Sequence, residues 1–496
     1  MPISRIKYVF FVVFYLLSLL FGISCNKLVQ VPNPISSVTT AQTFSSDATA
    51  TSAILGIYAY MSQNQSFSSY QTTFCAGESA DELIDQTPGY ESSDFFLSNT
   101  LTEWGVGGNS NVSGNLTNNF WSPAYYDIYC ANAVISGVQG SGGITTSTAN
   151  QLIGEAKFLR AFCYFYLTNL FGDIPLVLST DFNQTVLLPK TPQAQIYQQI
   201  ISDLLDAQTQ MISDFSLTGG QPIRANRWAA TALLARVYLY LPQPNNANYT
   251  SADSAASAVI NSGQFSLVPL PLVPEFPPNV VDPDSDAFLA NSKESILQLQ
   301  TANTNPWATW EGNFFVPYSP TNSASAWLTS QLLGAFESND LRRANWVDST
   351  YFNGTYYYYP SKYKVMNGQG TITENYTLLR LAEQYLIRAE AEMNLGQLGP
   401  AIDDLNTIRA RAQLDSLPSS LTQAQVLAAV QQEWRIEFFA EWGHRWLDLK
   451  RWGIAIQTLD TISYKVGNID STQLLYPIPM SDIQTDPNLK QNPGYN

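Results

Sequence analysis

The sequence predicts a mainly α-helical protein in which helical hairpins carry a long, irregular segment rich in aromatic residues. Apolar residues recur at spacings of three and four before residue 262 and again between residues 376 and 452, which is the period of a helix with one buried face. Between residues 263 and 375 that period largely disappears, and Pro, Trp and Tyr are frequent. Irregular segments of this length in a compact protein usually carry function.

The composition narrows the class of protein. The chain has 496 residues, a hydrophobic share of 45% and an aromatic share of 13%, so it can bury a large core and still stack on neutral ligands. Charged residues make up only 13%, and the net charge of −16 argues against nucleic-acid binding, which needs Lys and Arg to displace counterions. The single His excludes a site with several imidazoles, and the four Cys form no C-x-x-C pair, so we expect no metal cofactor.

Residues 1–24 have the pattern of an export signal. Arg5 and Lys7 precede an apolar run from Tyr8 to Leu20, which is shorter than the ~20 residues of a membrane span. Cys25 follows at once and resembles the acylated cysteine of a bacterial lipobox, although Gly22 stands where Leu is usual. We therefore expect a lipoprotein signal peptide, a lipidated tether at residues 25–45 and one domain over residues 46–496. A plain signal peptide is the alternative.

The first helices follow the tether. One is expected from Ser46, because apolar residues recur there at helical spacing, and another over residues 119–135. Residues 62–118 are rich in Ser, Asn and Gly and predict long surface loops. The clearest helical pattern ends at Gly172, and its apolar stripe runs through Leu152, Ala156, Leu159, Cys163, Tyr166 and Leu170. We interpret Cys163 as a packing residue of that stripe.

Helical hairpins are predicted in two further stretches. Residues 224–241 repeat the apolar stripe with small residues that allow a second helix to approach closely. Residues 376–414 contain two periodic segments separated by Gly396 and Gly399, an arrangement similar to a tetratricopeptide unit. We expect three or four such hairpins in all. Between them, the Tyr run at residues 356–359 is interpreted as a strand or hairpin edge.

Taken in order, several stretches resemble the SusD/RagB family, the outer-membrane nutrient-binding lipoproteins of Bacteroidetes. They cover residues 155–177, 235–241, 379–412, 433–453 and the carboxyl-terminal 474–496. The resemblance implies a SusD-like fold with tetratricopeptide-like hairpins and a loop-rich ligand-binding half. The scaffold would span residues 46–262 and 376–452, the irregular aromatic region residues 263–375, and a final loop segment residues 453–496.

The resemblance also implies a function without catalysis. A protein of this family captures oligosaccharides at the cell surface, is anchored in the outer membrane through its lipid, and passes the ligand to a SusC-like TonB-dependent β-barrel. Peptide or glycopeptide capture is one alternative. A surface glycoside hydrolase and a structural lid without its own ligand affinity are two others.

Aromatic side chains in the loops are the expected ligand contacts, because the apolar C–H faces of sugars pack on them. In similar proteins loops at two places build the site. In this chain the first region holds Tyr70, Tyr90 and Trp104, and the second holds Trp307, Trp310, Tyr318 and Trp327. No motif fixes the individual contacts. The alternative for each is burial in a loop core or against the barrel partner.

Charged motifs have simpler interpretations. His444 lies in a stretch that belongs to the family pattern, and we interpret it as part of a structural helix. The neighbouring carboxylates Asp81 with Glu82 and Asp403 with Asp404 do not indicate a glycosidase, which needs two carboxyls ~5–9.5 Å apart across one bond. We therefore expect no catalytic residue.

One acidic run resembles the start of a calcium loop. Asp282, Asp284 and Asp286 alternate there, but Ala287 and Lys293 stand where an EF-hand has Gly and Glu. A looser structural calcium site is kept as an alternative to no cofactor at all.

Overall fold

The computed structural model describes residues 39–62, 67–85, 94–102, 117–242, 244–272, 285–301, 307–319, 322, 324–366 and 372–495. Residues 1–43 and 44–496 form separate compact units, and α2 (Thr40–Thr43) is the described element of the first. The expected signal peptide, together with Cys25, Tyr90, Trp104, Asp282 and Asp284, lies outside the described residues. Across the described ranges, no helix is both long and apolar enough to cross a membrane.

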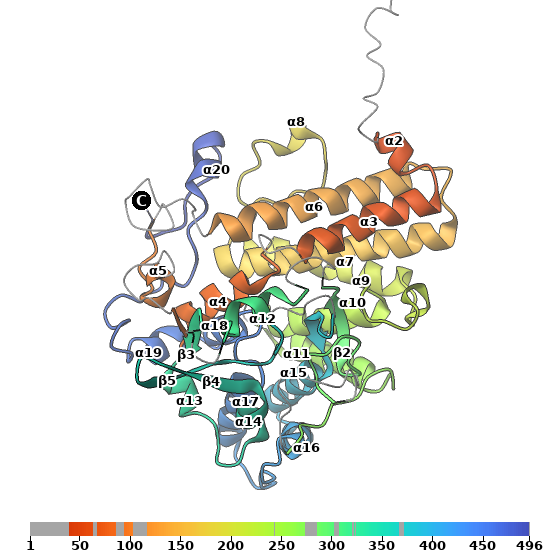
Figure 1. The fold of residues 1–496 in the computed structure, drawn as a ribbon. Helices are drawn as coiled ribbons and strands as arrows, with labels where there is room; N and C mark the ends of the chain where they lie inside the picture. The colour runs from red at the N-terminus through yellow and green to blue at the C-terminus, as the bar shows by residue number, and fades with distance from the viewer. Residues whose placement is uncertain are drawn as a thin grey trace, which may run out of the picture. The chain divides into compact units, whose positions relative to one another are not determined.

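Packed helices form the scaffold of residues 44–496. Each packs against the next along the chain, α6 on α7, α7 on α9, α9 on α10, α10 on α11, α11 on α15 and α15 on α16, while α3 lies along α6 and α7 (Figure 1). The expected fold class, mainly α with helical hairpins, is confirmed. The scaffold helices are α3 (Asp47–Met61), α6 (Asn118–Gln139), α7 (Thr146–Phe171), α9 (Gln193–Gln210), α10 (Arg227–Leu239), α11 (Asn246–Ile260), α15 (Leu381–Asn394), α16 (Leu398–Arg411) and α17 (Gln423–Glu437).

Local sequence explains where these helices begin and end. Ser46 caps α3, because its hydroxyl accepts a hydrogen bond from the Thr49 backbone N–H at 3.3 Å. The predicted stripe of α7 is buried along its whole length, and the helix ends at Gly172, whose positive φ of 77° suits glycine. Tyr166 on that stripe and the neighbouring Phe162 pack against the ring of Trp442, and this contact joins α7 to the carboxyl-terminal part of the chain.

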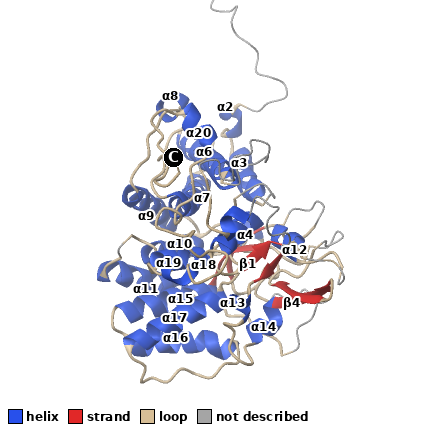
Figure 2. Ribbon diagram, turned by 90° about the vertical axis from the view of Figure 1, so that its left-hand side faces the viewer, coloured by secondary structure: helices blue, strands red, loops and turns tan. Residues whose placement is uncertain are grey.

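Short antiparallel strand pairs gather beside the helices (Figure 2). The Tyr run lies in β5 as expected, and the β4–β5 hairpin turns at Asn353 and Gly354, both with positive φ. The pairs are β1 (Leu83–Asp85) with β3 (Ala326–Leu328), β2 (Ser295–Leu299) with β6 (Tyr376–Arg380), and β4 (Val347–Phe352) with β5 (Thr355–Pro360).

One expectation is wrong. Residues 62–118 were expected to form surface loops, yet α4 (Tyr70–Ser79) lies there and is buried from Thr72 to Ser79. A helix enclosed on all sides needs no apolar stripe, so the periodicity that marks surface helices is absent from it. The remaining short helices are α5 (Asp94–Leu97), α8 (Phe182–Thr185), the 3₁₀ turn Ser216–Thr218, α12 (Trp310–Phe315), α13 (Ser330–Leu333), α14 (Leu341–Trp346), α18 (His444–Arg451), α19 (Ala455–Leu459) and α20 (Met480–Thr485).

A network of buried ion pairs joins the strands to the carboxyl-terminal helices. Arg380, at the end of β6, donates to Glu294 at 3.0 Å and to Glu441 at 2.9 Å, and it also pairs with Glu437 of α17. Arg411 of α16 pairs with the same Glu294 and Glu437. Arg380 and the three glutamates are buried, and the Arg411 side chain is only 4% exposed. Arg342 of α14 extends the network to Asp340 and Glu433.

The network holds Glu437 in its ionised form. Burial alone would raise the pKa of Glu437, but the charges of Arg411, Arg380 and Arg342 outweigh burial and lower that pKa well below the usual range. A carboxyl whose pKa is lower in the folded than in the unfolded state stabilises the fold at any pH above its ordinary pKa. That stabilisation is lost as the pH falls through the pKa of the folded state. The network therefore stabilises the fold at neutral pH and weakens only in strong acid.

Replacing Arg380 by Met tests how strongly the fold depends on these pairs. The variant leaves Glu294, Glu437 and Glu441 buried with one partner fewer, so we expect a loss of ~3–5 kcal/mol in the free energy of unfolding, measured by urea denaturation. Lys157→Met is the control, because Lys157 pairs with the half-exposed Asp206 and such pairs contribute at most ~1 kcal/mol. Equal losses in the two variants would contradict a structural role for the network.

Candidate functional site

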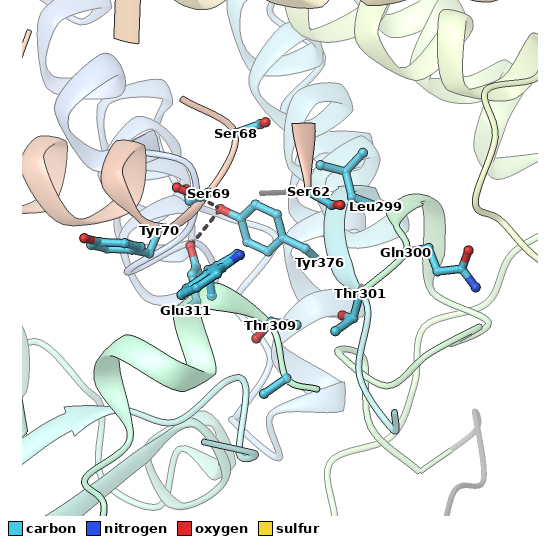
Figure 3. Close-up of a pocket in the computed structure, with 12 residues that line it drawn as sticks. Ser62, Ser68, Ser69, Tyr70, Leu299, Gln300, Thr301, Thr309, Glu311 and Tyr376 are labelled. Carbon is cyan, nitrogen blue, oxygen red and sulfur yellow. Dashed lines mark hydrogen bonds between the residues drawn. The ribbon is translucent and has the colours of Figure 1, made fainter. Parts of the chain in front are cut away.

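A small pocket with a cavity volume of about 30 Å³ lies where four segments of the chain meet. The segment before α4, the end of β2, the start of α12 and one residue of β6 supply its walls (Figure 3). The lining residues are Ser62, Ser68, Ser69, Tyr70, Leu299, Gln300, Thr301, Ala308, Thr309, Trp310, Glu311 and Tyr376.

Two of the aromatic residues expected from the sequence meet at this pocket. Tyr70 comes from the first loop region and Trp310 from the second, and both side chains are partly exposed. The ring of Tyr70 stacks on Phe314 of α12, with centroids 4.1 Å apart and planes inclined by 19°. Because this contact joins α4 to α12, the two aromatic walls are held in one fixed arrangement.

The inner wall of the pocket is polar. Glu311 and Tyr376 point toward one another in Figure 3, and the Tyr376 hydroxyl donates to Glu311 Oε1 at 2.8 Å. The Thr73 hydroxyl donates to the same oxygen and accepts from the Trp442 backbone N–H at 2.9 Å. Burial raises the pKa of Glu311 to about 8, against the opposing effect of the two hydrogen bonds.

The backbone around α12 is tightly specified. Thr309 caps the helix by accepting from the Gly312 N–H at 3.0 Å, and three residues upstream of Trp310 the backbone of Trp307 has a φ of 52°, in the left-handed region. A Cβ on Gly312 would stand 2.5 Å from the carbonyl oxygen of Val365. Only glycine therefore lets α12 approach this segment, and that approach sets the position of Trp310 and Glu311.

The other expected contacts lie elsewhere. Trp307 is partly buried and does not line the pocket, while Tyr318 is 79% exposed. Trp327 of β3 packs on Tyr357 of β5, with centroids 4.4 Å apart. Tyr90 and Trp104 fall outside the described residues. The residues that sequence reasoning missed, Glu311 and Tyr376 above all, belong to no motif, and only the neighbouring Trp310 gave a signal near them.

Three of the charged residues singled out in the sequence, Asp81, Asp404 and His444, form ion pairs or are enclosed in the core. Asp81 pairs with Arg445 and Arg435, and Asp404 pairs with Arg388. His444 is enclosed beside the rings of Trp434 and Phe438, where burial lowers its pKa well below the usual value and nearby cations add to the effect.

Glu82 and Asp286 likewise have protein partners. Glu82 accepts from the Ala440 N–H at 3.3 Å, and burial raises the pKa of Glu82 to about 8. Asp286, the described member of the acidic run, pairs with Lys364. Within the described ranges, no group of three or more His, Cys, Asp or Glu residues is arranged to hold a metal ion.

A second, larger and more open hollow, with a volume of about 300 Å³, lies between α6 and α20. Trp121 and Tyr125 of α6 contribute its aromatic wall, and Asp482 and Asp486 its acidic rim. Trp121 Nε1 donates to Asp482 at 3.2 Å, so this wall is fixed as well. None of the aromatic residues expected from the sequence lines it.

Replacing Gly312 by Ala tests how the first pocket is built. The added Cβ must push α12 away from Val365, which moves Trp310 and loosens the stack of Tyr70 on Phe314. We expect a change in the near-ultraviolet circular dichroism of the aromatic residues and a loss of ~1–3 kcal/mol in stability. Gly399→Ala is the control, because a Cβ at Gly399 meets no atom within 4 Å. Unchanged aromatic spectra in the Gly312 variant would contradict this account.

Comparisons with known proteins agree with the sequence and the fold. The model of the SusD family matches residues 291–495, and a model described as "starch-binding associating with outer membrane" matches residues 64–239. The SusD-like protein P2 of Formosa agariphila is 27% identical over 97% of this chain and 99% of its own length. The starch-binding protein SusD of Bacteroides thetaiotaomicron is 37% identical over 24% of this chain and 21% of its own length.

Solved structures show the same fold. A SusD homolog from Bacteroides thetaiotaomicron has a TM-score of 0.74 at 19% identity, covering 91% of this chain and 97% of that one. A SusD superfamily protein from Parabacteroides distasonis has a TM-score of 0.72 at 21% identity, covering 92% of this chain and 100% of that one. The two family models together span both halves of the helical scaffold and the pocket between them. The chain belongs to the SusD/RagB family.

Proposed function

We propose that this chain is a lipoprotein of the outer membrane that binds oligosaccharides at the cell surface and delivers them to a SusC-like TonB-dependent β-barrel. The observation that carries the proposal is the pocket in which Tyr70 and Trp310, from two distant segments, face a common space beside the polar wall of Glu311 and Tyr376. Membership of a family with starch-binding members that associate with the outer membrane supports both the ligand class and the location.

The lining suits a neutral sugar. The partly exposed rings of Tyr70 and Trp310 offer faces on which the apolar side of a pyranose can pack, and aromatic contacts of this kind each contribute ~0.5–1.5 kcal/mol. Ser69, Gln300 and Thr309 supply polar groups for the hydroxyls at the edge of the ring. Among the described residues of the lining there is no Lys or Arg that would balance an anionic ligand.

Binding without turnover is favoured by the number of carboxyls. Hydrolysis of a glycosidic bond ordinarily uses two carboxyl groups on opposite sides of the bond. Among the described residues that line the pocket, Glu311 is the one carboxyl. The adjacent pairs of the sequence do not add a second, because Asp81 and Asp404 are engaged by arginines elsewhere. We propose that the protein is not an enzyme and needs no cofactor.

Anchoring and delivery complete the proposal. Cys25 would carry the lipid, residues 25–45 would form the tether, and the domain that follows would present the pocket to the barrel. The lipobox-like sequence and the family description support an outer-membrane anchor. The family resemblance supports the barrel partner.

Trp310→Ala tests the pocket as the glycan site. We expect the purified protein to bind one glycan class of a polysaccharide panel without releasing products, and the variant to bind it at least about fivefold more weakly, the equivalent of ~1 kcal/mol. Isothermal titration calorimetry gives the affinity, and analysis of reducing ends gives the turnover. Tyr318→Ala is the matched control, because Tyr318 is exposed and lies outside the pocket. Equal affinities in both variants would remove this pocket from the site, and product release would establish a hydrolase.

A further inference from the structure

Glu311 is the acidic side chain of the pocket, and its two oxygens have different surroundings. The residue is only 3% exposed, although it contributes to the lining. Tyr376 and Thr73 both donate to Oε1, whereas no described residue donates to Oε2. The Thr73 oxygen accepts a hydrogen bond from the Trp442 N–H. This bond orients the Thr73 hydroxyl, whose hydrogen is then available to Glu311. The arrangement fixes the plane of the carboxyl group.

The charged surroundings determine whether this carboxyl is ionised. Two charged residues affect the pKa of Glu311: Glu441, in the turn between α17 and α18, and Lys362, in the segment after β5. Tyr376 and Tyr363 are the phenols that interact with it. Burial is the largest effect and raises the pKa of Glu311 to about 8, the two hydrogen bonds and Lys362 oppose it, and Glu441 adds to it. At neutral pH most molecules therefore hold Glu311 as the uncharged acid.

The position of the proton follows from the hydrogen bonds. Where Thr73 and Tyr376 both donate to Oε1, which is the shorter of the two contacts that the Tyr376 hydroxyl makes, the acid proton lies on Oε2. Neighbouring hydroxyls of the lining are engaged as donors: Ser68 donates to the Met61 carbonyl at 2.6 Å and Thr301 to the Glu374 carbonyl at 2.7 Å. The Thr301 oxygen can accept a hydrogen bond from a ligand, whereas protonated Glu311 offers a hydrogen.

We propose that Glu311 is a specificity-determining residue of the pocket, which in its protonated form donates a hydrogen bond from Oε2 to an acceptor oxygen of a neutral glycan. The inference rests on the proposed function. It adds that the protein donates the hydrogen of this polar contact and that the ligand is uncharged there. A uronate would find no cation among the lining residues that the structure describes, and ionised Glu311 would repel it. A sugar with an uncharged ring or glycosidic oxygen at this point suits the donor.

The inference predicts a pH dependence with a definite sign. A ligand that needs the protonated acid binds with constant affinity below the pKa of Glu311 and loses up to tenfold in affinity per pH unit above it. With a pKa of about 8, the loss between pH 6.5 and pH 9.0 is about tenfold. A ligand that used Glu311 as a charged acceptor would bind more tightly over the same range.

Calorimetric titrations of wild type and Glu311→Gln at pH 6.5, 7.5 and 9.0 test the inference with the glycan that binds best in the panel. Wild type should lose about tenfold in affinity, while the variant, whose amide donates at every pH, should be weaker at pH 6.5 but show no further loss. Glu392→Gln is the control, because burial also raises the pKa of Glu392, to about 7, and Glu392 lies on α15 outside the pocket. This control should follow the wild-type profile.

A second measurement needs no substitution. Titrations at pH 8.5 in buffers with different enthalpies of ionisation report the protons taken up on binding, and we expect about 0.8 proton per glycan. No uptake, a wild-type profile that stays flat, an equal loss in Glu311→Gln or tighter binding at pH 9.0 would each overturn the inference. If a glycan binds and Trp310→Ala weakens it, these results overturn the inference alone. If no glycan binds, the proposed function is contradicted and the inference falls with it.

Discussion

The buried charges around Arg380 and Glu437 constrain the rest of this structure. Each ionised group removed from water costs several kcal/mol unless its partners stay in place, so the elements that carry them must be positioned together. Arg380 ends β6, Arg411 lies on α16, Glu437 ends α17 and Glu294 precedes β2. The helical scaffold and the strand pair beside the pocket are thereby joined into one body.

The same network reaches the pocket through a short chain of contacts. Glu441 pairs with Arg380, and the next residue, Trp442, donates its backbone N–H to Thr73, which in turn donates to Glu311. Trp442 also stacks on Tyr376, with centroids 4.9 Å apart, so both partners of the Glu311 carboxyl are held by it. The backbone of Trp442 lies at a φ of 49°, a left-handed conformation that a bulky residue adopts only where the surroundings enforce it. The polar wall of the pocket is thus rigid because the core behind it is rigid.

Helices whose apolar residues recur at the helical spacing could be predicted from the sequence, and elements without such a pattern could not. The stripe of α16 has the helical period because one side of that helix meets the core and the other meets water. α7 from Gln151 onward and α15 have no exposed residue, yet their apolar residues still recur at the helical spacing. α4 is enclosed on all sides, and β2 and β6 are buried at every position, so none of them shows an alternation that sequence analysis can detect. The Tyr run of β5 was predictable because aromatic residues favour exposed hairpins as well as cores.

The residues of the candidate site could likewise be predicted only in part. Composition directed attention to the aromatic loops, and two of their residues, Tyr70 and Trp310, do meet at a pocket. Which aromatic rings come together depends on contacts between distant segments, such as Tyr70 with Phe314, and a single sequence does not encode these contacts as a pattern. Glu311 could not be predicted at all, because its chemistry arises from burial and from Thr73 and Tyr376, which are more than 60 residues away in the chain.

A crystal structure of the protein with its best-bound glycan tests the central claim most directly. The account predicts a sugar ring against Trp310 and Tyr70, with a neutral oxygen of the glycan within hydrogen-bond distance of Glu311 Oε2. A glycan seated instead in the hollow between α6 and α20, or on the exposed tyrosines of the β4–β5 hairpin, would contradict it.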